Sequence, residues 1–500
     1  MARRRTAELV LPSAQPRRFD RVLKWGVLGL VVALGLWAAP RLPDAWRWAT
    51  GKPAKFRPEH PVALDRVDLR ALHAEHWTPW IVAAAQATPG VPTPRLASAR
   101  STIRNAVAAD LNLLGLFDEL DGIVTSAKLS SVAGRQRALW LVGAWNDYVD
   151  TNGQPFFLHA DVLSQRGAAL VYAPAYRVVG DTAGQVGDER VRGRAISRLD
   201  RTNLRETYLG YASSADEGAL LLADRVTTHA LARVWPLLAG SAGASIERRP
   251  FADAVLAEAR AALPAELVAE LVATAPTQAA VVDAFAGMRE RSGCSGLAWR
   301  EMPWNGYDQE QLSELAGHVE GGACAGVHPS EFAAIRAASE TYPARPQLES
   351  ALARLVAWVA RPVVVHELRH VADAIERGDD DTPRTCGICE LTDPDAVRAE
   401  VSAYVAQLAW SDSPALALHQ ICVSTDGDPD EQTIHGRARA AVVTGLSGSC
   451  REGAPPDLAA QARRIEADAF GRSEAIALDP AFPHRLPLVA ERDRDPTALE

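Results

Sequence analysis

The chain has 500 residues, of which 48% are hydrophobic and 23% are charged. This composition is ordinary for a globular protein, and the length suggests two or three folded units. The formal net charge of −9 argues against a general nucleic-acid binder, because such proteins carry a basic domain or stripe. We therefore expect no nucleic-acid partner.

A basic N-terminus precedes a short apolar segment. Residues 25–39 carry no charge, and Lys or Arg is frequent in the 24 residues before them. By the positive-inside rule we predict a cytoplasmic basic tail at 1–21, a transmembrane anchor at 22–42 and a linker at 43–60. A cleaved signal peptide is an alternative that also exports the rest of the chain, and a buried core helix is a third. The main domain is expected to be periplasmic or extracellular.

The remaining chain predicts an α+β fold that is mostly helical. Helical spacing is found at 64–86 and 100–145 and again from 217 onward. β-branched and aromatic residues between 155 and 200, separated by Gly- and Asp-containing turns, predict a small antiparallel sheet. We divide the chain into an N-terminal α+β region at 61–250, a catalytic region with the cysteines at 251–478 and a loose tail at 479–500.

The helices expected in the second half are interrupted by proline and glycine. Predicted helices span 217–239, 251–275, 278–291, 330–340 and 347–360.

Six cysteines all lie in the C-terminal half, and an even number in an exported protein predicts disulfides. They are Cys294, Cys324, Cys386, Cys389, Cys422 and Cys450. The pair Cys386 and Cys389 allows three interpretations. It could be a redox-active pair, half of a structural zinc site completed by His419 and Cys422, or a set of disulfides that pin this loop to the other four cysteines. We favour the disulfides, because they would fix the neighbouring helices.

A metal-binding motif lies at His366-Glu367-Leu368-Arg369-His370. Two histidines four residues apart on a helix lie on one face, so both imidazoles can bind one Zn²⁺. The intervening Glu367 lies about 100° around the helix, beside the open coordination position. There it can act as the general base that takes a proton from the zinc-bound water.

The residues around the motif favour a helix. Pro362 suits a first helical position, and Gly378 with the following Asp run predicts the end. The apolar stripe is formed by Val364, Leu368, Val371 and Ile375, and the opposite face by His366, His370, Asp373 and Arg377. We expect one face to pack on a core and the other to face a cleft.

At residues 350–410 the chain resembles the zincin metallopeptidases, and this resemblance implies a bound zinc ion with a third protein ligand. In the metzincin pattern the glycine and the third histidine would fall at Asp373 and Glu376, so the glycine is absent here. The gluzincin pattern places a glutamate on a downstream helix, and residues 393–410 predict such a helix. We predict Glu400 as the third ligand, with Glu390 and Asp395 as weaker alternatives.

Further residues around the metal are less specific. Asp373 could accept a hydrogen bond from a ligand imidazole or from a neighbouring helix, and Tyr404 could donate to an oxyanion or pack. No substrate-binding histidine stands out, although His318, His328 and His419 are possible.

These residues predict a membrane-anchored, extracytoplasmic zinc peptidase that hydrolyses a peptide or protein of the cell envelope. Two alternatives stay open. One is a non-catalytic envelope protein that binds a partner through a zincin-like or helical fold. The other is a metal-dependent hydrolase of another bond, for which the ligands would be the same.

Overall fold

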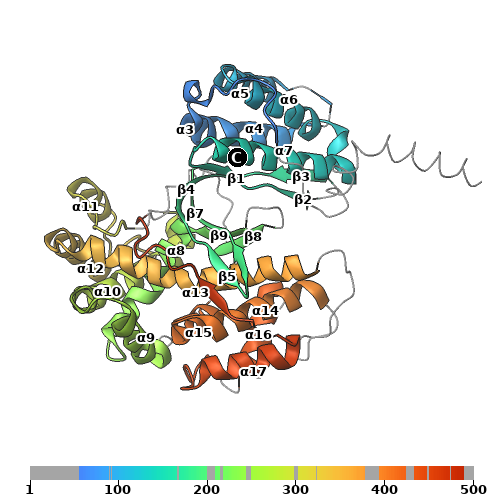
Figure 1. Cartoon of the computed structure of the whole chain (residues 1–500). Coiled ribbons are helices and arrows are strands. Elements are labelled where there is room, and N and C mark those ends of the chain that lie inside the picture. The colour runs from blue at the N-terminus through green and yellow to red at the C-terminus, as the bar shows by residue number, and fades with distance from the viewer. Residues whose placement is uncertain are drawn as a thin grey trace, which may run out of the picture. The chain divides into compact units, whose positions relative to one another are not determined.

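The structure is a computed structural model, shown in Figure 1. It describes residues 56–88, 90–91, 93–165, 168–199, 209–213, 218–243, 249–297, 302–322, 324–377, 394–423, 433–446, 450–472 and 474–488. The predicted cytoplasmic tail, the predicted anchor or signal at 22–42 and most of the predicted linker lie outside these residues. All described residues belong to one compact unit, Lys55–Glu500.

The predicted α+β class with mostly helical content is confirmed. The N-terminal part is built from helices, several of which have side-chain caps at their starts. Thr93 accepts a hydrogen bond from Leu96 N, and Asp110 and Ser131 cap the next two long helices in the same way. The elements are η1 (Leu64–Arg66), α3 (Leu69–Ala71), η2 (Leu72–His76), α4 (Trp77–Gln86), α5 (Pro94–Val107), α6 (Leu111–Val124), η3 (Ala127–Ser130) and α7 (Val132–Thr151).

These helices enclose an aromatic core. The Trp77 ring lies 5.0 Å from the ring of Trp80 and 5.5 Å from that of Trp145, and Phe117 lies 5.1 Å from Trp80 between ring centroids. Trp80 Nε1 donates to Asp121 Oδ1 at 2.9 Å, which satisfies the one polar atom of the buried indole. The capped helix starts and the buried rings explain why 100–145 forms three separate helices instead of one.

Three small sheets follow. The largest has the strand order β1 (Phe156–Leu158), β4 (Ala175–Asp181), β7 (Gly193–Arg198), β9 (Gly218–Leu222) and β8 (Gly210–Ser213). The second has the order β10 (Ile476–Leu478), β5 (Gly184–Val186) and β6 (Glu189–Val191), and the third is the hairpin of β2 (Asp161–Gln165) and β3 (Ala168–Tyr172).

The prediction of antiparallel strands between 155 and 200 is confirmed, with two differences. β7 and β9 pair in parallel, since the chain returns to β7 after a crossover. Residues 218–222, predicted as the start of a helix, form the fully buried strand β9, whose apolar run suits burial on both faces.

The C-terminal part is helical. Its elements are α8 (Ala223–His229), η4 (Ala230–Val234), η5 (Trp235–Ala239), α9 (Arg249–Ala262), α10 (Ala265–Ser295), α11 (Gln309–Ala316), α12 (Pro329–Thr341), η6 (Tyr342–Ala344), α13 (Leu348–Arg377), α14 (Pro394–Trp410), α15 (Pro414–Cys422), α16 (Ile434–Gly445) and α17 (Leu458–Phe470).

Two prolines that were expected to separate helices lie inside them. Pro276 lies within α10 and Pro362 within α13, so the predicted helix boundaries near these prolines are wrong. The break that separates α9 from α10 falls instead at Pro264, whose backbone is not helical. A proline inside a helix removes one backbone hydrogen bond, and burial of the residues on both sides offsets that cost.

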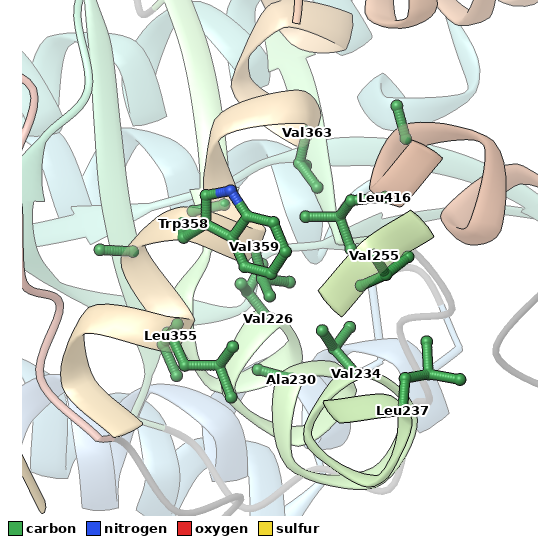
Figure 2. Packing of buried hydrophobic residues seen from close by; sticks show 14 of the residues in the cluster. Val226, Ala230, Val234, Leu237, Val255, Leu355, Trp358, Val359, Val363 and Leu416 are labelled. Atoms are coloured by element: carbon green, nitrogen blue, oxygen red, sulfur yellow. The ribbon is translucent and has the colours of Figure 1, made fainter. Parts of the chain in front are cut away.

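The main core surrounds the first half of α13. Figure 2 shows Trp358, Val359 and Val363 of this helix packed among residues of α8, η4, α9 and α15. Trp358 Nε1 donates to Ser413 Oγ at 2.7 Å. Each fully buried aliphatic side chain contributes roughly 1.5–3 kcal/mol, so the helix is firmly held before it reaches the metal-binding motif.

This core joins residues from both sides of position 250. Val226 and Trp235 are buried in the same cluster as Val255 and Leu355. The predicted division into regions at 61–250 and 251–478 therefore does not match the packing. The N-terminal core instead ends with the first strands, at Leu199.

Among the described residues, one helix is long and apolar enough to cross a membrane. It is α10, and 44% of its most apolar window is buried. Leu271, Ala275 and Phe285 of this helix are buried in the main core. We therefore describe α10 as a core helix.

The first part of the predicted loose tail is packed. Phe482 and Leu486 are buried, and Leu486 N donates to Ala353 O at 3.1 Å. Asp479 pairs with Arg190. The prediction of a loose tail is thus wrong for residues 479–488, because two apolar side chains within this Pro- and Arg-rich stretch cover α13.

Candidate metal centre

The last turns of α13 carry His366, Glu367 and His370. Strands β5, β8, β9 and β10 all contact this helix. His366 and Glu367 are buried, at 8% and 5% relative exposure. Elements on both sides of the motif hold these side chains in place.

The third residue comes from α14, which begins at Pro394 as predicted. Asp393, its expected N-cap, lies outside the described residues. Val397, Val401 and Leu408 are buried on the core side of the helix. α13 and α14 pack against each other, and this contact brings Glu400 to the two histidines.

Donor atoms of three residues meet between these helices. His366 Nε2 and His370 Nε2 lie 3.1 Å apart. Glu400 Oε2 lies 3.4 Å from His366 Nε2, and Glu400 Oε1 lies 3.3 Å from His370 Nε2. The structure therefore brings together the three residues that the sequence predicted as metal ligands, in a group that could hold a metal ion.

The spacing of these atoms suits zinc. A tetrahedral zinc ion with bonds of about 2.0–2.1 Å holds neighbouring N and O donors roughly 3.3–3.4 Å apart. The distances of 3.1 Å between the two nitrogens, and of 3.3 Å and 3.4 Å from the two Glu400 oxygens to one nitrogen each, are close to this value. Among the described residues, no fourth His, Cys, Asp or Glu belongs to the same group of donor atoms. Three protein ligands with an open fourth position are typical of catalytic zinc sites.

The charges of the triad favour a cation. Burial acts to raise the pKa of Glu400, but hydrogen bonds from His366, His370 and His435 hold this pKa well below its usual range. Glu400 is therefore an anion at neutral pH. Burial lowers the pKa of His366. Burial also acts to lower the pKa of His370, but the hydrogen bond and the charge of Glu400 outweigh it and raise the pKa to about 9. A metal ion would replace the proton held between His370 and Glu400.

Glu367 lies beside the triad and faces strand β8, which forms the edge of the five-stranded sheet. A Cβ atom added to Gly210 of this strand would lie 2.9 Å from Glu367 Cγ and 3.0 Å from its Oε1. Only glycine leaves room for the glutamate at this point. Burial raises the pKa of Glu367 to about 8, so in the metal-free protein the side chain is mostly protonated at neutral pH.

The two residues predicted to support the metal ligands lie close to the triad. The Tyr404 ring packs on the His366 ring, with 4.6 Å between centroids. Asp373 forms an ion pair with Arg472, which follows α17, and Arg472 also donates to Ser402 Oγ at 3.2 Å. Asp373 thus ties α13 to the C-terminal segment through Arg472.

A buried ion pair lies on the other side of the motif helix. Arg369 is fully buried, and its Nη2 donates to Glu466 Oε1 at 2.6 Å and to Glu474 O at 3.3 Å. Glu466 also accepts a hydrogen bond from Trp410 Nε1 at 2.6 Å. This network connects α13, α14 and α17, and thereby fixes the two ligand-bearing helices relative to each other.

Sequence reasoning missed His435. This residue lies on α16, and its Nδ1 is 3.1 Å from Glu400 Oε2. The sequence held one weak sign of this residue. Thr433 is a typical N-cap residue, and it begins a helix that follows the two ligand helices along the chain. Of the histidines considered before, His419 is fully buried against Phe251.

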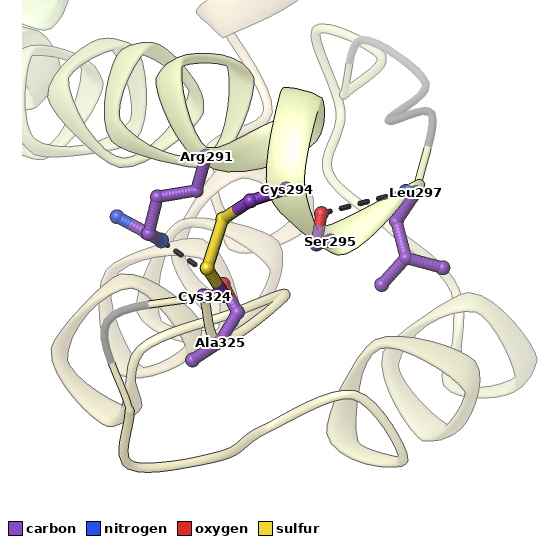
Figure 3. The surroundings of a disulfide bond; sticks show 6 residues. All are labelled: Arg291, Cys294, Ser295, Leu297, Cys324 and Ala325. Atoms are coloured by element: carbon purple, nitrogen blue, oxygen red, sulfur yellow. Dashed lines mark hydrogen bonds between the residues drawn. A yellow bond between two sulfur atoms is a disulfide. The ribbon is translucent and has the colours of Figure 1, made fainter.

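Two disulfides are present among the described residues. Cys294 is bonded to Cys324, beside the hydrogen bond from Arg291 Nε to Ala325 O shown in Figure 3. Cys422 is bonded to Cys450. The expectation of disulfides is thus confirmed for four of the six cysteines.

The expected links from the loop of Cys386 and Cys389 are wrong. Each of the four other cysteines is already bonded within its own pair, so none can bridge to this loop. For the same reason Cys422 cannot join His419 in a structural zinc site. Cys386 and Cys389 themselves lie outside the described residues.

The comparisons with known proteins give no relative. No protein-family model, no curated protein and no solved structure matches this chain.

Proposed function

We propose that this protein is a zinc-dependent peptidase of the gluzincin-like type. The observation that carries the proposal is the meeting of His366 Nε2, His370 Nε2 and a Glu400 carboxylate within 4.8 Å, beside a buried Glu367 that is not one of the three. Two nitrogens and one carboxylate oxygen are a donor set that zinc takes in hydrolases, and a free glutamate beside them supplies the base.

The roles of the residues follow from their positions. His366, His370 and Glu400 would hold the ion. When bound, zinc would polarise the substrate carbonyl and lower the pKa of a water molecule. Its positive charge would also favour the ionised form of Glu367, whose pKa burial otherwise raises. Glu367 would then accept the proton of the attacking water and pass it to the leaving amine.

We further propose that the peptidase acts outside the cytoplasm and is anchored by its N-terminal apolar segment. Two features support this: the disulfides Cys294–Cys324 and Cys422–Cys450, which are characteristic of oxidising compartments, and the basic residues before the segment 25–39. The proposed substrate is a peptide or protein of the cell envelope.

Removal of the metal tests the proposed activity. The purified full chain should hydrolyse members of a fluorogenic peptide library, lose this activity after treatment with a zinc chelator, and regain it when zinc is added. Added magnesium should not restore it, because magnesium prefers six oxygen ligands. Hydrolysis that survives complete removal of the metal would contradict the proposal. A zinc-loaded chain that cleaves no peptide would favour another bond as the substrate.

A further inference from the structure

His435 approaches the metal centre from a third helix. It is the second residue of α16, and the Thr433 side chain accepts a hydrogen bond from Gly436 N at 2.9 Å, which fixes the first turn. α16 packs against α14, the helix that carries Glu400. The His435 side chain keeps 32% of its surface exposed, whereas that of Glu400 keeps 15%. His435 therefore covers Glu400 from the solvent side.

The contacts of Glu400 are divided between its two oxygens. Oε1 lies 3.3 Å from His370 Nε2, and Oε2 lies 3.4 Å from His366 Nε2 and 3.1 Å from His435 Nδ1. Tyr404 Oη lies 3.4 Å from the same His435 nitrogen. The 3.1 Å between His435 Nδ1 and Glu400 Oε2 is an ion-pair distance, and an ionised carboxylate offers only acceptors to this ring nitrogen. His435 is not one of the three residues whose donor atoms could hold the ion.

We propose that His435 is a positioning residue of the metal centre, which holds Glu400 Oε2 and so orients this carboxylate as the third ligand. The inference rests on the proposed zinc site and adds a residue to it. A carboxylate on a flexible side chain loses rotational freedom when it binds a metal, and a donor that fixes it beforehand strengthens binding.

The chain path also holds α16 in place. Cys422 is the last residue of α15 and Cys450 follows α16, so their disulfide ties together the two ends of the segment that contains His435. The Cα atoms of the two cysteines lie 5.5 Å apart. This bond limits how far α16 can move from α14, and with it the distance from His435 to Glu400.

Zinc affinity of the full chain, measured by competition with a chromogenic chelator, tests this role. His435→Ala should weaken zinc binding about 10–100-fold, as is usual when a partner of a metal ligand is removed. His435→Asn should restore most of the affinity, because its amide nitrogen occupies the place of Nδ1. His435→Gln, whose amide corresponds to Nε2, should not. His484→Ala, at an exposed site away from the metal centre, is the matched control and should leave the affinity unchanged.

A double variant separates positioning from a general loss of structure. If His435 acts through Glu400, adding His435→Ala to Glu400→Ala should cause no further loss of zinc affinity. If His435→Ala caused the same loss of zinc affinity with and without Glu400, it would not act through Glu400. If His435→Ala left the affinity unchanged while Glu400→Ala weakened it, His435 would not position the ligand. Either result would overturn the positioning role but not the zinc site. Failure of the wild-type chain to bind zinc would overturn the proposed function itself.

Discussion

Replacement of Glu367 by glutamine is expected to slow peptide hydrolysis by about 10²–10⁴-fold while zinc stays bound. The change removes the proton acceptor but none of the three donor atoms of the triad. Glu349→Gln, at an exposed site on the same helix, is the matched control and should keep full activity. Hydrolysis rates and zinc content are measured on the same samples. Unchanged turnover in Glu367→Gln would remove this residue from the mechanism.

The same variant should be more stable than the wild type when metal is absent. The folded-state pKa of Glu367, about 8, exceeds its ordinary value of 4.5, so ionisation opposes folding as pH rises between these values. At pH 7 the glutamine should therefore raise the free energy of unfolding by on the order of 3 kcal/mol, and at pH 4 by little. Urea unfolding of the chelated proteins at both pH values measures this difference. Equal gains at both pH values would contradict the assignment to Glu367 ionisation.

The largest loss of stability is expected for Arg369→Met. Removing this side chain leaves the Glu466 carboxylate buried without its cation, which typically costs about 3–5 kcal/mol. Burial already raises the pKa of Glu466, and without Arg369 this pKa should rise further. A protonated Glu466 is tolerated in the interior, so the loss should be smaller at pH 5 than at pH 8.

Two further variants test whether the loss of stability in Arg369→Met comes from the buried ion pair. Arg369→Met combined with Glu466→Gln should recover much of the stability, because no charge is then buried and the amide oxygen can still accept from Trp410. Arg336→Met breaks an exposed pair with Glu340 of similar length and should leave the unfolding midpoint unchanged. If Arg369→Met and Arg336→Met unfolded at the same denaturant concentration, the buried network would not support the metal helices as described.

The parts of the site that could be predicted are those encoded in local spacing. His366 and His370 lie four residues apart on a helix, which brings them to one face wherever the helix packs. Glu400 could be predicted because Pro394 and the stripe of Val397 and Val401 define the second helix. The α+β class was accessible from local sequence too, through the β-branched and aromatic residues between turns at 155–200.

The remaining features depend on contacts distant in sequence. The partner of Arg369 lies 97 residues away, so the motif gave no sign that this position is fully buried. His435 reaches Glu400 only through the packing of α16 on α14. Pro276 and Pro362 act locally against a helix, and only the surrounding core overrides that preference.

The zinc content of the purified full chain, determined by elemental analysis, tests the central claim most directly. Wild type, His366→Ala and Glu400→Ala should be compared, with circular dichroism to confirm that each is folded. The account predicts about one zinc ion per wild-type chain and its loss from both variants, since each lacks one of three ligands. Wild-type protein that is folded, has never met a chelator and contains no zinc would contradict the account. Undiminished zinc in Glu400→Ala would contradict the assignment of the third ligand.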